Sequence, residues 1–118
     1  MKRDVCLFVE DILERINLIE DSTKDISKLK FKMDKVLVDA TIRRLEIIGE
    51  AAKNIPNYFR EKYGGVPWRD ISGFRDVLVH VYFGVNLDKI WAVIRDDLPK
   101  LKRDIEEILE KEKINDDL

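Results

Sequence analysis

Arg75, His80 and Tyr82 lie within eight residues of one another and carry the side chains of this sequence best suited to acid–base and anion chemistry. His80 is the only histidine, and imidazole has an ordinary pKa near neutrality, so it can take up or release a proton at neutral pH. The Arg75 guanidinium can hold two oxygens of a phosphate at once, and the Tyr82 hydroxyl can orient such a group. Each residue also has a structural interpretation: a packed histidine, a salt-bridging arginine and a core tyrosine with a solvated hydroxyl.

The spacing of the three residues does not by itself bring them together. On an ideal helix Arg75 and Tyr82 share a face because they are seven residues apart, whereas His80 lies about 140° around the helix from Arg75. Convergence of the three side chains therefore requires a distorted helix end near Gly84 or a cleft shared between two subunits.

Other familiar catalytic arrangements are missing from the sequence. One histidine is too few for the common zinc sites, which usually have three protein ligands. Gly64 and Gly65 lack the spacing of a phosphate-binding loop and the lysine that follows it. No serine or cysteine occupies a nucleophile-elbow context, and Cys6 is interpreted as a packing residue. We therefore expect a site without a metal or a cofactor.

The composition predicts one water-soluble domain over residues 1–118. Apolar residues make up 45% and charged residues 39% of the chain, which is typical of charged helices packed around a core. No apolar run reaches the roughly 18 residues needed to cross a membrane, and the N-terminal apolar stretch is interrupted too soon for a signal peptide. A single cysteine cannot form an internal disulfide, so we expect a cytoplasmic protein.

The net charge of −2 gives little indication of the partner. Residues 41–82 are the only net-basic third, with 7 Lys and Arg against 5 Asp and Glu, and five of those seven cations are arginines. Arginine is the cation that forks onto phosphate, although a solvated helix face would look the same.

Apolar residues recur at helical spacing along most of the chain. The pattern predicts helices over residues 5–19, about 33–55, a short stretch through Lys62, from Pro67 to about 84, from Asn86, and from Asp97 and Pro99 onward. We expect the polar run 20–25 to end the first helix and Pro56 to end the second. Short connections favour antiparallel neighbours, so the predicted fold is all-α, an up-and-down bundle of four to five helices.

Some details of this bundle are less determined. Gly49 and the alanines beside it would let another helix approach closely, and Asn86 is expected to be an N-cap. Residues 77–85 can also be read as a strand. The tail 111–118 is expected to fray.

Two long stretches of the sequence resemble the HepT-like HEPN family. One is residues 66–85, VPWRDISGFRDVLVHVYFGV, which contains the family motif of Arg, four residues, His, one residue and Tyr. The other is residues 40–52, ATIRRLEIIGEAA, which resembles the second-helix signature of the family. Trp91 and the break at 97–99 also fit, so the resemblance covers nearly the whole chain.

The resemblance implies a helical bundle that forms a homodimer with the motif at the subunit interface. It also implies metal-independent endoribonuclease activity of a toxin in a type VII-like toxin–antitoxin module. The implied partner is a minimal nucleotidyltransferase antitoxin, in a larger hetero-oligomer if the two assemble further. This antitoxin would adenylylate Tyr82 and so neutralise the toxin.

RNA cleavage without a metal needs a base, an acid and a positive charge at the phosphorus. His80 suits proton transfer, and Arg75 suits stabilisation of the charge that grows on the phosphate. Because each chain has one histidine, the second proton carrier is either His80 of a second copy in a dimer or Glu50. Arg43 and Arg44 are candidates for RNA contacts. The polar stripe that contains Glu50 and Arg43 has the simpler interpretation of a solvated helix face.

Two other interpretations remain open. In the first, the chain is a non-catalytic HEPN subunit that binds nucleotide or RNA and scaffolds a partner nucleotidyltransferase. In the second, it is a plain helical interaction protein in which His80 has a structural role.

Overall fold

A computed structural model describes residues 3–74, 78 and 86–117, with side chains from residue 5 to residue 113 within these ranges. The described residues contain helices and no strand, so the predicted all-α class is confirmed. The elements are α1 (Arg3–Thr23), α2 (Lys28–Met33), α3 (Lys35–Asn54), α4 (Asn57–Lys62), α5 (Trp68–Ser72), α7 (Leu87–Ala92), the π-helical turn η1 (Val93–Asp97) and α8 (Leu98–Asp117).

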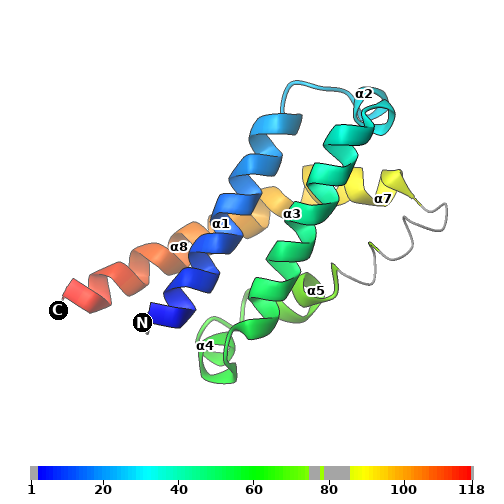
Figure 1. The fold of residues 1–118 in the computed structure, drawn as a ribbon. Helices are drawn as coiled ribbons and strands as arrows, with labels where there is room; N and C mark the ends of the chain where they lie inside the picture. The colour runs from blue at the N-terminus through cyan, green and yellow to red at the C-terminus, as the bar shows by residue number, and fades with distance from the viewer. Residues whose placement is uncertain (1–2, 75–77, 79–85, 118) are drawn as a thin grey trace.

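The long helices form the body of the molecule (Figure 1). α1 and α3 run side by side in opposite directions, connected through α2, and α8 packs against α1. Ile12, Ile16 and Ile48 are fully buried between these helices, and α8 contributes Ile105 to the same core. None of the described helices is long and apolar enough to span a membrane.

α1 ends where its polar sequence predicts. We expected residues 20–25 to end the helix, and α1 ends within this run, at Thr23. The Thr23 hydroxyl donates a hydrogen bond to the Ile19 carbonyl (2.7 Å), and Arg95 donates to the carbonyls of Thr23 (2.6 Å) and Ile26 (3.0 Å). The arginine thus satisfies carbonyls at and just after the end of α1, and so stabilises this helix end.

A short helix, α2, precedes the long central helix and was not predicted. Ser27 caps α2 by accepting a hydrogen bond from the Lys30 amide (3.2 Å). Asp34 then ends α2 and caps α3 by accepting from the Leu37 amide (3.0 Å). Two capping residues seven positions apart therefore cut off a separate helix, whose Phe31 is fully buried.

The predicted break at Pro56, the helix through Lys62 and the close approach at Gly49 are all confirmed. A single helix from Pro67 to about 84 is wrong, because α5 ends at Ser72. Gly73, a poor helix former, caps α5 with its amide donating to the Arg69 carbonyl (3.0 Å). Phe74 is again helical, as is Leu78, while the expected end at Gly84 lies outside the described residues.

The predicted break at Asp97 and Pro99 is wrong, since α7, η1 and α8 form one continuous helical run. Pro99 has no amide hydrogen, and its ring would clash with the carbonyl four residues earlier in a regular helix. The π-helical turn widens the backbone just before the proline, with the Leu98 amide donating to the Val93 carbonyl. The helix thus passes through Pro99 without ending.

α8 is helical to Asp117, and the expected fraying of residues 111–118 stays a prediction. Glu112, near the end of α8, is only 3% exposed. Its carboxylate accepts hydrogen bonds from the Lys62 ammonium and the Tyr63 hydroxyl, both at 2.9 Å. Burial and the bond to Glu112 together raise the pKa of Tyr63 to about 12.

Candidate active site

The three motif residues, Arg75, His80 and Tyr82, lie outside the described residues. The structure instead defines the two ends of the motif segment and one point within it. Phe74 precedes the segment, Asn86 follows it, and Leu78 between them is 3% exposed within the hydrophobic core. These three residues show what the fold holds in place around the motif.

The α5 end of the segment is seated firmly on the core. Trp68 is buried, and its indole nitrogen donates to the Tyr63 carbonyl (3.0 Å). α5 also approaches α3 at Gly49, where an added Cβ would lie 3.3 Å from the Ile71 carbonyl oxygen and 3.8 Å from the Cβ of Phe74. Any side chain at Gly49 would therefore press on the turn that leads into the motif.

The α7 end of the segment is held by different contacts. Asn86 has a φ of 71° in the left-handed region, which asparagine tolerates better than most residues. It occupies the N-cap position of α7, as predicted, although its side chain makes no capping hydrogen bond. Asp88 accepts from Lys32 (3.1 Å) and lies 3.4 Å from Lys28. Hydrogen bonds from Lys32, and then from Lys28, hold the pKa of Asp88 below its ordinary value.

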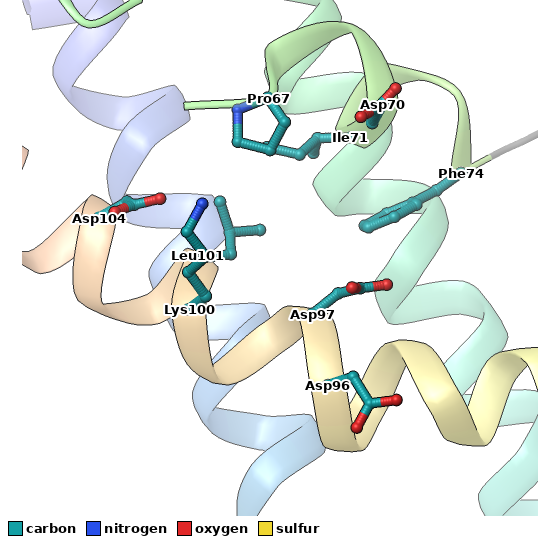
Figure 2. A pocket seen from close by; sticks show the side chains of 9 residues that line it. All are labelled: Pro67, Asp70, Ile71, Phe74, Asp96, Asp97, Lys100, Leu101 and Asp104. Atoms are coloured by element: carbon teal, nitrogen blue, oxygen red, sulfur yellow. The ribbon is translucent and has the colours of Figure 1, made fainter. Parts of the chain in front are cut away.

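An acidic pocket of about 210 Å³ opens beside Phe74, between α5 and the η1–α8 run (Figure 2). Asp70 lies on the α5 side, and Lys100 on α8 is the cation that lines the pocket. Three further carboxylates come from η1 and α8: Asp96, Asp97 and Asp104. Among the described residues no three potential ligands are grouped so as to hold a metal ion. A pocket with four carboxylates and one ammonium repels phosphate.

The supporting residues predicted on α3 fall into two groups. Arg43 is exposed and pairs with Glu46 at 3.2 Å, and Glu50 is exposed with no partner for its carboxylate in the described part of the chain. Arg44 instead faces α1, where its guanidinium donates to the Ser22 hydroxyl (3.2 Å) and the Leu18 carbonyl (3.4 Å). The structure thus accounts for Arg44 as a link between α1 and α3.

The turn of α3 next to Glu50 lies beside the start of the motif segment. Gly49, its neighbour in sequence, faces Phe74, the residue immediately before Arg75. α3 therefore brings a solvent-exposed carboxylate to this region of the fold, while Arg43 lies two helical turns earlier on the same face. The lysines that surround Asp88 on α2 were not among the predicted site residues.

The family match and the relatives of this chain agree with one another. The profile of the HepT-like ribonuclease family matches residues 12–108. The chain is 50% identical over 111 residues to a Methanocaldococcus jannaschii protein named gamma-glutamylcyclotransferase and putative RNase, covering 94% of this chain and 50% of that protein. It is 48% identical over 106 residues to a Caldanaerobacter subterraneus protein named putative RNase, and the match covers 90% of this chain and 95% of that protein. A Thermococcus cleftensis protein named probable ribonuclease HepT is 45% identical over 108 residues, covering 92% and 98%. No solved structure matches this chain.

Proposed function

This chain belongs to the HepT-like ribonuclease family, and from that premise we propose that it is a metal-independent endoribonuclease that acts as the toxin of a type VII-like toxin–antitoxin pair. The observation that supports this most is the position of the motif. Arg75, His80 and Tyr82 all lie within the family match at residues 12–108. The chain spans about half of the first relative, so its cellular activity and partners are part of the proposal.

The proposed reaction is attack by the 2′-hydroxyl of RNA on the adjacent phosphorus. The hydroxyl loses its proton to a base, the new 2′-oxygen–phosphorus bond closes a 2′,3′-cyclic phosphate, and the bond to the 5′-oxygen breaks. The departing oxygen takes a proton from an acid. His80 carries one of these protons, and Arg75 stabilises the negative charge that builds on the non-bridging oxygens.

The second proton carrier is proposed to come from a homodimer in which two copies of His80 share one cleft. Glu50 is the alternative, and its support is positional: its carboxylate is exposed and its helical turn faces Phe74. The two alternatives differ when wild-type and His80→Ala subunits are mixed at random. A shared cleft needs two intact copies, so an equal mixture should keep about a quarter of the activity, whereas independent sites should keep about half.

Regulation is proposed to act on Tyr82. A cytoplasmic minimal nucleotidyltransferase would transfer AMP from ATP, with the Tyr82 oxygen displacing pyrophosphate and its proton passing to solvent. The added anion would pair with Arg75 and block the access of RNA. Co-expression with such a partner, followed by mass spectrometry, should find AMP on Tyr82, and Tyr82→Phe should abolish it. Tyr58, which is 52% exposed, provides the matched control, since Tyr58→Phe should leave the modification unchanged.

The activity itself is tested by incubating purified protein with RNA in EDTA. Wild type should produce ends with 2′,3′-cyclic phosphate, and both His80→Ala and Arg75→Ala should lose this product while keeping the wild-type circular dichroism spectrum. Equal cleavage by wild type and both variants would mean contamination and would refute the proposal. Absence of cleavage by wild type on any RNA would favour the non-catalytic subunit that scaffolds its partner.

A further inference from the structure

The chain carries one concentrated basic segment outside the motif. Residues 24–35 contain five lysines against two aspartates, a net charge of +3, while the whole chain carries −2. Four of these lysines belong to α2 and the first residue of α3: Lys28, Lys30, Lys32 and Lys35. We call these four the α2 lysine surface.

α2 is fixed next to the α7 end of the motif segment, with two of its lysines, Lys28 and Lys32, on that side. The fully buried Phe31 packs on the Trp91 ring, with 5.4 Å between ring centroids, and thereby holds α2 against α7. On the adjoining face, Lys28 and Lys32 both reach the single carboxylate of Asp88. Two ammonium groups on one carboxylate leave a positive charge uncompensated, only two residues after Asn86.

The other two lysines have no acidic partner within the described part of the chain. Lys30 and Lys35 line an open groove at the junction of α1, α2 and α3. Asp34, which lines the same groove, accepts a hydrogen bond from the Leu37 amide with its carboxylate. Both ammonium groups therefore remain available for an external anion.

The two described ends of the motif segment lie in opposite electrostatic surroundings. At Phe74 the pocket presents four aspartates against Lys100, and two residues after Asn86 the carboxylate of Asp88 meets Lys28 and Lys32 of the α2 lysine surface. A polyanion is repelled at the first end and attracted at the second. The charge distribution of the protein would then favour approach of a polyanion from the α7 side.

We propose that the α2 lysine surface binds the sugar–phosphate backbone of single-stranded RNA and guides it toward the motif from the α7 side; this proposal rests on the proposed ribonuclease function. Lysine ammonium groups act as point charges on phosphates and read no base edges, so the binding is independent of sequence. Leu29, Met33 and Val36, which are 68%, 75% and 81% exposed, lie among the lysines. A protein partner with an acidic rim is the competing occupant of this apolar surface.

The test measures binding of a fluorescent single-stranded oligouridylate with 2′-O-methyl groups, which cannot be cleaved through its 2′-oxygen. The variant is Lys30→Gln/Lys35→Gln, and the matched control, Lys111→Gln/Lys113→Gln, removes the same charge at the far end of α8. Each phosphate contact with a single strand contributes about 0.7 to the slope of log affinity against log salt. Loss of two contacts should lower the slope by about 1.4 and the affinity about 25-fold near 0.1 M salt, while the control stays within about twofold of wild type.

Cleavage of unmodified RNA separates this proposal from the proposed function. A raised KM with unchanged kcat in Lys30→Gln/Lys35→Gln supports both. RNA binding by Lys30→Gln/Lys35→Gln equal to that of wild type, or equal weakening in the control pair, overturns RNA binding by the α2 lysine surface, even if wild type cleaves RNA. The surface is then assigned to a protein partner. Lysine-dependent binding without any cleavage upholds the surface and refutes the ribonuclease.

Discussion

Replacement of Gly49 by valine should both destabilise the protein and disturb the motif. An added Cβ at this position lies 3.3 Å from the Ile71 carbonyl oxygen, already tighter than ordinary contact, and 3.6 Å from the Ser72 carbonyl oxygen. The two methyl groups of valine must extend beyond that Cβ, so α3 and α5 have to separate. Overpacking of this kind costs about 1–3 kcal/mol, partly offset by about 0.4 kcal/mol because valine is a better helix former than glycine.

The net loss corresponds to a fall in Tm of about 2–10 °C for a domain of this size, measured by thermal unfolding. Gly65→Ala is the control, because no atom lies within 4 Å of an added Cβ there, and its Tm should stay at or slightly above that of wild type. Separation of α5 from α3 also displaces Phe74, and misplacement of a catalytic group by about 1 Å can reduce the rate of cleavage about 100-fold. Wild-type Tm and wild-type cleavage in Gly49→Val would refute the assigned role of this contact.

Two further predictions concern the ends of helices. Arg95→Ala should lower the free energy of unfolding by about 2 kcal/mol, because it removes charged hydrogen bonds to the carbonyls of Thr23 and Ile26. Chemical denaturation measures this free energy. The control is Arg103→Ala, on the exposed face of α8, which should lower it by less than about 0.5 kcal/mol. The pKa of Tyr63 is about 12 in the folded protein against 10.0 for its ordinary value, so the folded state holds this proton more tightly than the unfolded chain. The resulting stability is fully present below pH 10 and is lost as the pH rises toward 12. Tyr63→Phe should flatten this part of the pH profile of Tm, and an unchanged profile would contradict the assignment.

The sequence predicted the long helices well because their positions follow from a local apolar pattern. The expected helix over 33–55 is α3 at Lys35–Asn54, and Pro56 ends it as expected. A local pattern does not show the distant contacts that hold a helix end, or the backbone changes that let a helix continue. The polar end of α1 is stabilised by Arg95, a residue 72 positions away from Thr23, which no local pattern shows. Pro99 indicated a break, yet a π-helical turn accommodates it within a continuous helix.

In the candidate site, too, the sequence indicated some features and the structure was needed for others. The motif was recognisable in the sequence as a string of residues. The structure adds what holds the segment in place: α5 and Leu78 pack on the core, and α7 packs against α2. Arg44, a candidate RNA contact, donates hydrogen bonds that join α1 to α3, and its role in RNA binding stays a prediction. Charge in the sequence therefore indicates a candidate, and only the fold distinguishes a cation available to a ligand from one that satisfies a helix end.

The charge balance along the chain illustrates why sequence counts missed the α2 lysine surface. Residues 1–40 carry 8 basic and 9 acidic residues, so the count suggests an acidic third of the chain. The fold separates those charges, because most of the acidic residues are spread over α1 and α3, while Lys28, Lys30 and Lys32 lie on the short α2 and two of them reach α7. A protein with a net charge of −2 can therefore offer a phosphate backbone a local positive surface next to its motif, and an acidic pocket on the other side. For such a protein the arrangement of charge, rather than its sum, determines the approach of an anionic substrate.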